Sequence, residues 1–186
     1  MSNLIQDGLS SVLPTRHPLT QDSRMPIVEA AIQINAPAAL VYAVSQDYRV
    51  RYDWDPFPES IEVVSGSMEE LTVGTQVRVR SRLGMTMLVE FVQVAPPRRA
   101  AIRMIEGPAL ISKFAGSWLF DATGPDGTLV RFRYALATRP RWLAWAGDRI
   151  ATAYFSRTAR QRLQGLKRYC EALAGTPAQA MPQERA

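Results

Sequence analysis

Residues 32–44, IQINAPAALVYAV, decide the fold, because a strand pattern changes into a helix pattern within a few positions. The run 27–34 is rich in Ile and Val, which favour strands. Asn35 and Pro37 then supply a capping residue and a first-turn proline, the two residue types that commonly open a helix. The stretch therefore predicts a strand over 27–34 and a helix over 38–46.

The sequence after this helix predicts one more helical piece and then strands only. The piece covers 47–53 and ends at DPFP, residues 55–58, because the residue before a proline is pushed out of the helical region. Asp126-Gly127 is the strongest hairpin signal, and connections this short force neighbouring strands to be antiparallel. The predicted strands, each bounded by Gly or Pro, cover 61–67, 75–83, 85–94, 100–106, 113–121 and 128–138.

From Arg141 onward the apolar residues follow a helical period, which predicts one long amphipathic helix. Gly147-Asp148 could interrupt its start, with Asp148 as a new cap. The stripe of this helix consists of Phe155, Ala159, Leu163, Leu166, Cys170 and Leu173.

These patterns divide the chain into an N-terminal extension (1–25), a ligand-binding domain (26–174) and a flexible tail (175–186) that is rich in Pro, Ala and Gln. The first 24 residues lack the basic start of a secretory signal, and no apolar run approaches the roughly 20 residues that a membrane span needs. We therefore expect a cytoplasmic protein.

The sheet should carry one covered face, because 75–83 and 128–138 alternate apolar and polar residues. Strands lie about 4.8 Å apart, so the predicted sheet is roughly 30 Å wide, whereas one helix is about 10–12 Å across. A single helix cannot cover such a sheet, so a curved sheet should enclose an apolar cavity. The alternative is that large side chains fill the interior. Those expected on the covered face are Met87, Val89, Phe91, Ile102, Met104, Phe114, Trp118 and Phe120.

Charge and residue counts exclude several kinds of chemistry. Lys and Arg number 22 against 17 Asp and Glu, a net charge of +5, but the arginines are scattered singly, which favours a solvated face over a nucleic-acid site. Those on the last helix, Arg162 among them, are assigned to that face. With only His17 and Cys170, the chain has no set of zinc ligands, no internal disulfide and no histidine base for a serine triad. Phosphate-binding glycine loops are also missing, so we expect no cofactor and no metal.

The element order, together with residues 32–44 and DWDP (53–56), resembles the START-like, Bet v 1-like superfamily (SRPBCC) and, within it, the polyketide cyclase/dehydrase group. The resemblance spans about 26–173. Further stretches are similar to bacterial aromatase/cyclases: IEGP (105–108), GSW (116–118) and GTLVRF (127–132). The resemblance implies an α+β helix-grip fold, in which a curved seven-stranded antiparallel sheet wraps around a long C-terminal helix, with two short helices after the first strand.

The leading functional hypothesis is binding of a hydrophobic small molecule, such as a lipid, quinone or polyketide-like compound, in an internal cavity. Fold alone does not decide among these ligands or between binding and catalysis. The candidate ligand-binding residues are Trp54, Met87, Phe91, Met104, Trp118, Phe132, Tyr134 and Phe155.

Two alternatives remain open. The resemblance also implies a polyketide aromatase/cyclase or dehydratase, which needs proton transfer and a stabilised enolate, and Tyr134 and Glu106 are the candidate catalytic residues. Strand 85–91, MTMLVEF, lacks the inward Arg that this resemblance implies. The other alternative is a membrane-associated carrier that makes transient contact with headgroups through Arg139, Arg141, Trp142 and Trp145.

Overall fold

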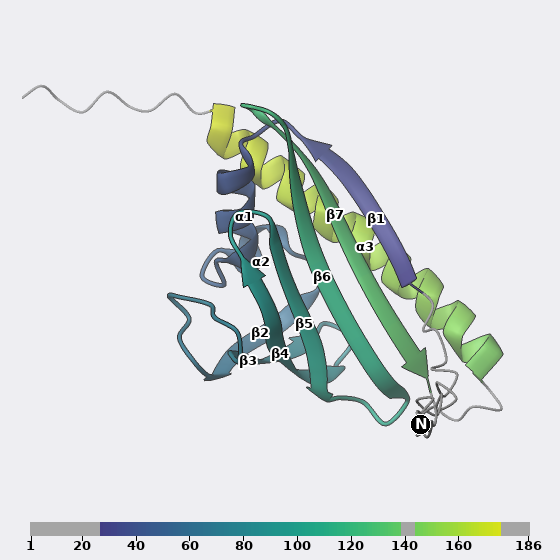
Figure 1. Ribbon diagram of the computed structural model, residues 1–186. Coiled ribbons are helices and arrows are strands. Elements are labelled where there is room, and N and C mark those ends of the chain that lie inside the picture. Colours follow the sequence, from purple (N-terminus) through teal and green to yellow (C-terminus); the bar gives the residue numbers. More distant parts are fainter. Residues whose placement is uncertain (1–26, 139–143, 176–186) are drawn as a thin grey trace, which may run out of the picture.

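A computed structural model describes residues 27–138 and 144–175, which form one antiparallel sheet with helices on one side (Figure 1). The chain runs through β1 (Ile27–Ile34), α1 (Ala38–Gln46), α2 (Arg51–Trp54), β2 (Pro58–Ser65), β3 (Gln76–Ser81), β4 (Thr86–Ala95), β5 (Arg99–Glu106), β6 (Ile111–Gly124), β7 (Gly127–Thr138) and α3 (Ala144–Gly175).

The sheet has seven strands in the order β1-β7-β6-β5-β4-β3-β2, and every neighbouring pair is antiparallel. Short connections link β2 through β7 as neighbours, whereas β1 joins the far edge beside β7. The long helix α3 crosses one face of the curved sheet, and α1 and α2 lie near one end of it (Figure 1). This arrangement confirms the predicted α+β helix-grip fold.

Two local predictions were wrong. The helix α3 runs without a break through Gly147-Asp148 for 32 residues, because an interior glycine costs only about 1 kcal/mol relative to alanine. The second helical piece is α2, which begins at Arg51 rather than at residue 47. The Asp47 carboxylate accepts hydrogen bonds from the backbone and the side chain of Arg49, which holds a turn between α1 and α2.

Helices α2 and α3 are in direct backbone contact at Gly165. A Cβ atom built on this glycine would lie 1.9 Å from the carbonyl oxygen of Trp54. Only glycine permits this approach. The contact holds the side chains of α2 against the face of α3 that points toward the sheet.

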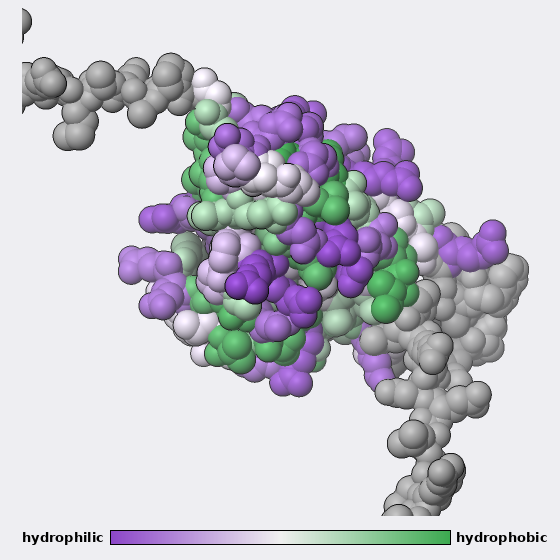
Figure 2. Space-filling model, turned by 45° about the horizontal axis from the view of Figure 1, so that its top comes forward, coloured by the Kyte–Doolittle hydropathy of each residue, from purple (hydrophilic) through white to green (hydrophobic). Residues whose placement is uncertain are grey.

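The outer face of the sheet carries arginines that form ion pairs with acidic residues on adjacent strands. Arg78 lies 2.8 Å from Glu62, and Arg103 lies 2.6 Å from Glu90. Further pairs join Arg80 to Glu59, Arg131 to Asp121 and Arg133 to Glu29. The strand arginines therefore match the predicted solvated face, and in the surface view of Figure 2 hydrophilic and hydrophobic residues are interspersed.

Candidate ligand-binding site

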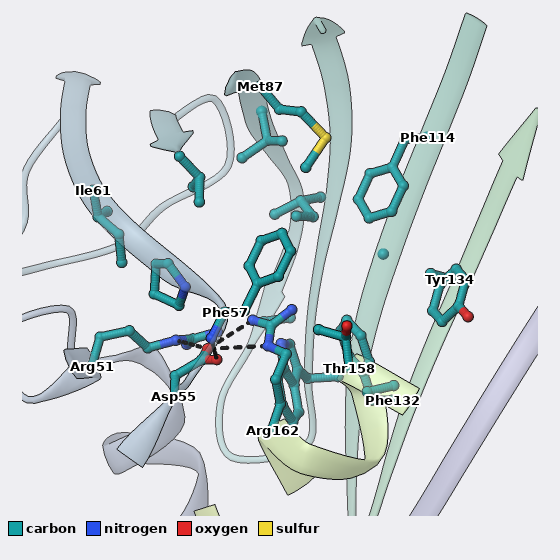
Figure 3. Close-up of a pocket in the computed structure, with 18 of the residues that line it drawn as sticks. Arg51, Asp55, Phe57, Ile61, Met87, Phe114, Phe132, Tyr134, Thr158 and Arg162 are labelled. Carbon is teal, nitrogen blue, oxygen red and sulfur yellow. Dashed lines mark hydrogen bonds and ion pairs between the residues drawn. The ribbon is translucent and has the colours of Figure 1, made fainter. Parts of the chain in front are cut away.

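A cavity lies between the inner face of the sheet and α3, with α2 at one end (Figure 3). It leaves about 70 Å³ of room for the centre of a water-sized sphere, several times the roughly 10–15 Å³ that a single water molecule needs. The void predicted from the widths of sheet and helix is therefore present, and the alternative of a completely filled interior is wrong.

The wall of the cavity is mainly apolar, as the alternation in the strands predicts. Neighbouring residues in a strand point to opposite faces, so one set from each strand faces α3. Strand residues on this wall include Val79, Met87, Val89, Phe91, Ile102, Phe114, Trp118 and Phe132, and α3 adds Phe155 and Ala159.

Six of the eight residues expected to bind a ligand line the cavity: Met87, Phe91, Trp118, Phe132, Tyr134 and Phe155. The structure places the other two elsewhere. Trp54 lies behind the Arg51 guanidinium, whose central carbon is 4.5 Å from its ring, and packs edge-on against Trp118. The sulfur of Met104 packs over Gly107. We therefore leave Trp54 and Met104 out of the candidate site.

The two candidate catalytic residues lie in different surroundings. Tyr134 lines the cavity, but its hydroxyl lies 3.3 Å from Ser156 Oγ and 3.4 Å from the carbonyl oxygen of Thr152, both on α3. Burial raises the pKa of Tyr134 above 10.0, so the phenol is protonated at neutral pH. Its hydroxyl is engaged with the helix.

Glu106 is exposed and does not line the cavity. The register between β4 and β5 shifts near this end, so that Met104 pairs with Val89 whereas Glu106 pairs with Leu88. This irregularity ends the simple alternation that would have put Glu106 on the inner face with Met104. The position gives no support for Glu106 as a base acting in the cavity.

A buried cluster of charges occupies the end of the cavity beside α2 and was missed by the sequence analysis. Asp55 Oδ2 accepts a hydrogen bond from Arg51 Nε at 2.7 Å and lies 2.9 Å from Arg162 Nη2. Arg162 Nε also donates to this oxygen, at 3.1 Å. Figure 3 shows the two arginines meeting at Asp55. The Asp55 side chain is fully buried, and those of Arg51 and Arg162 are 7% and 14% exposed.

Two further polar atoms of this cluster also form hydrogen bonds. Asp55 Oδ1 accepts the backbone N–H of Phe57 at 3.1 Å, and Arg51 Nη1 donates to the carbonyl oxygen of Ser45. The Arg162 guanidinium lies over aromatic rings as well, with its central carbon 5.0 Å from the centre of Phe132. Hydrogen bonds and rings together offset part of the loss of water around these charges.

The cluster sets the ionisation of its members. Burial by itself would raise the pKa of Asp55, but the charges of Arg162 and Arg51 outweigh it, and the pKa lies below 3.8. Burial lowers the pKa of Arg162 from its usual value, and the Asp55 carboxylate opposes this effect. An arginine guanidinium remains protonated near neutral pH, so the cluster carries two positive charges and one negative charge.

The assignment of Arg162 to the solvated face was wrong. Arg162 follows Phe155 by seven residues and precedes Leu166 by four, a spacing that belongs to the buried stripe of an amphipathic helix. A charged residue within that stripe was the available signal. Asp55 stands out in the sequence only as part of the motif DWDP, and no sequence pattern indicates that it pairs with Arg162.

Several other expectations concern residues that the structure does not describe. Arg139, Arg141 and Trp142 lie outside the described residues, and Trp145 lies in α3 with a side chain that is not described. Within 27–138 and 144–175, no group of His, Cys, Asp or Glu could hold a metal ion. No helix of this part of the chain is long and apolar enough to span a membrane.

Solved structures with the same fold include aromatase/cyclases and START proteins. Zhui aromatase/cyclase from Streptomyces sp. R1128 superimposes with a TM-score of 0.71 at 20% identity, covering 81% of this chain and 96% of that one. A START superfamily protein from Mycobacterium smegmatis gives 0.67 at 13% identity, covering 79% and 98%. A protein from Thermus thermophilus gives 0.67 at 21% identity, covering 81% and 100%. At these identities the likeness concerns the fold.

No curated protein matches the sequence. A family described as "Polyketide cyclase / dehydrase and lipid transport" matches residues 25–171, which is most of the chain and includes every described element up to the last turn of α3. The chain belongs to this polyketide cyclase/dehydrase and lipid transport family.

Proposed function

We propose that the protein binds a hydrophobic small molecule, a lipid, quinone or polyketide-like compound, in the cavity between the sheet and α3. The observation that carries this proposal is an apolar wall around a void that the protein's own side chains leave open. Met87, Phe91, Trp118, Phe132 and Phe155 would contact the apolar body of the ligand. A cytoplasmic location belongs to the same proposal.

Binding is tested by native mass spectrometry of the purified chain and by a thermal-shift screen over lipids, quinones and polyphenols. A compound that binds the folded state should raise Tm by an amount that grows with the logarithm of its concentration above Kd. If no compound raises Tm and no ligand is carried through purification, the proposal is wrong.

A matched pair of variants localises the binding to the cavity. Gly116 lies on the wall, and a Cβ built there would meet Ile102 at 3.6 Å, an ordinary contact. Gly116→Leu should therefore fill part of the void and weaken binding about tenfold or more, a loss of roughly 1.4 kcal/mol. Ala115→Leu adds a similar side chain to the opposite face of β6 and should leave binding unchanged. Equal effects of the two variants would place the ligand elsewhere.

The second candidate function is that of a polyketide aromatase/cyclase or dehydratase, favoured by the family description and by the likeness to an aromatase/cyclase. Tyr134 is the candidate with access to the cavity. Turnover of a poly-β-ketone chain would be compared between the wild type, Tyr134→Phe and Glu106→Gln. A rate that falls only in Tyr134→Phe supports catalysis in the cavity, and unchanged rates remove both residues from a mechanism.

Transient membrane contact through Arg141, Trp142 and Trp145 stays a prediction. Co-sedimentation with anionic vesicles would support it if replacement of both tryptophans abolished the binding. Binding that survives this replacement would exclude these tryptophans as the contact.

A further inference from the structure

The charge cluster of Arg51, Asp55 and Arg162 is not balanced. It holds two guanidinium groups and one carboxylate, and within the described residues neither arginine forms an ion pair with any other acidic group. Buried charges in proteins are normally paired. The cluster therefore keeps one excess positive charge at the edge of an apolar cavity.

Each of the two arginines has two guanidinium nitrogens with hydrogen-bond or ion-pair partners and one terminal nitrogen, Nη2 of Arg51 and Nη1 of Arg162, with none among the described residues. Arg51 donates from Nε to Asp55 and from Nη1 to Ser45, and its guanidinium lies over the Trp54 ring. Arg162 directs Nε and Nη2 to Asp55, whereas its Nη1 has no hydrogen-bond partner among the residues that the structure describes. Both arginines line the cavity, but the Arg162 side chain is the more exposed of the two, 14% against 7%, so its free donor is the more available to a molecule inside.

The surroundings of Arg162 neutralise it incompletely. The rings of Phe57, Phe132 and Trp118 lie 5.1, 5.0 and 5.4 Å from its central carbon. Aromatic faces attract a cation, but they do not replace the strong acceptor that a charged donor prefers. Thr158 lies one helical turn before Arg162 and also lines the cavity, so a hydroxyl and a guanidinium share one face of α3.

We propose, resting on the ligand-binding function above, that the ligand is an acidic amphiphile: an apolar body with one anionic oxygen group that binds the guanidinium of Arg162. The body lies against the strand wall, for example against Met87 and Phe114. The anionic group lies at the α2 end, where it balances the excess charge of the cluster. Arg162 thus serves both to hold Asp55 and to recognise the ligand.

The proposal is tested by isothermal titration calorimetry of the purified full chain with two matched pairs of probes at neutral pH. One pair is aromatic, 2-naphthoate and 2-naphthamide, and the other is aliphatic, decanoate and decan-1-ol. Each pair keeps the apolar body and changes the charge of the oxygen group. The acid of at least one pair should bind about tenfold or more tightly than its neutral partner, since a charge-assisted hydrogen bond is roughly twice as strong as a neutral one.

Two variants on α3 test whether Arg162 causes the preference for the acid. Arg162→Gln should abolish the preference for the acid, whereas Arg157→Gln, the same change at an exposed position of the helix, should retain it. If Arg162→Gln does not fold, a crystal structure of the wild type with 2-naphthoate gives the same information. A carboxylate within hydrogen-bond distance of Arg162 supports the proposal, and a carboxylate elsewhere overturns it.

The outcomes separate this inference from the proposed function. Equal affinity for the acid and the neutral partner in both pairs overturns the inference but leaves binding of apolar molecules intact. A preference for the acid that survives in Arg162→Gln also overturns it. If none of the four probes binds, the inference is wrong, and the thermal-shift screen decides independently whether the cavity binds any apolar compound.

Discussion

The outer face of the sheet and the α2 end of the cavity both hold arginines against carboxylates, yet they do so in opposite ways. On the outer face an arginine pairs with a single acidic residue at the surface, as in the pair of Arg78 and Glu62, whose side chains are 44% and 65% exposed. In the cavity two arginines share Asp55, whose side chain is 0% exposed. The sequence contains the same residue types in both places, and the fold exposes one set and buries the other.

This difference predicts different energetic consequences. Exposed ion pairs contribute about 0–1 kcal/mol, because water and salt screen the charges and two long side chains lose entropy. Removing one partner of a buried pair costs roughly 3–5 kcal/mol, because the charge that remains is left without water or partner. Substitutions in each region test whether burial explains this difference in energy.

The largest effect should come from Asp55→Asn. The change removes the only negative charge of the cluster among the described residues and leaves Arg51 and Arg162 facing each other. We expect the free energy of unfolding to fall by about 3–5 kcal/mol, measured by urea denaturation. A loss below about 1 kcal/mol would show that the cluster behaves like the outer pairs.

The pH dependence of this variant provides a control. The pKa of Asp55 is lowered below 3.8 in the folded protein, so its contribution is fully present above the unfolded pKa and is lost as pH falls through the folded value. The difference in unfolding free energy between wild type and Asp55→Asn should therefore be constant near neutral pH and shrink below about pH 4. A difference that does not change in acid would contradict the assignment to the Asp55 charge.

An intermediate effect is expected from Gly165→Ala, which tests whether the cluster depends on the approach of α3 to α2. The new Cβ would overlap the carbonyl oxygen of Trp54, a backbone atom that cannot rotate away. We expect a loss of roughly 1–3 kcal/mol in thermal unfolding, although alanine favours helices more than glycine does. Gly175→Ala is the matched control, because no atom of the described residues lies within 4 Å of a Cβ at that position. An equal or higher Tm for Gly165→Ala than for Gly175→Ala would disprove the close contact.

The smallest effect should come from Glu62→Gln, which removes a carboxylate from an outer pair by the same acid-to-amide change. Because both side chains of this pair are largely in water, urea denaturation should show a loss of no more than about 0.5–1 kcal/mol. A loss near that of Asp55→Asn would mean that exposure does not explain the difference between the two regions.

The strands and α1 were predicted well, because alternating residues and Gly or Pro boundaries report local backbone structure directly. The strand over 27–34 and the helix over 38–46 have the observed bounds. The cavity was predicted for another reason: the width of a sheet and the width of a helix follow from backbone geometry alone.

Other features depend on contacts between distant parts of the chain, and these were not predictable. Asp55 and Arg162 are 107 residues apart, and their ion pair exists because Gly165 lets α3 approach α2. The face on which Glu106 lies could not be read from the sequence, because a shift of register in the β4–β5 pair changes the face of a strand without any sign in the local sequence. Arg162 was misjudged because charge was given more weight than helical spacing.

The contact of Gly165 with Trp54 also limits how the cavity adapts to its contents. The junction of α2 with α3 has no space for one additional methyl group, so this end of the cavity cannot widen to fit a larger ligand. A larger guest has to gain room on the opposite side, where unbranched side chains such as Met87 change rotamer at low cost. Selectivity for the anionic group of the ligand and tolerance for the size of its apolar body thus depend on opposite ends of the cavity.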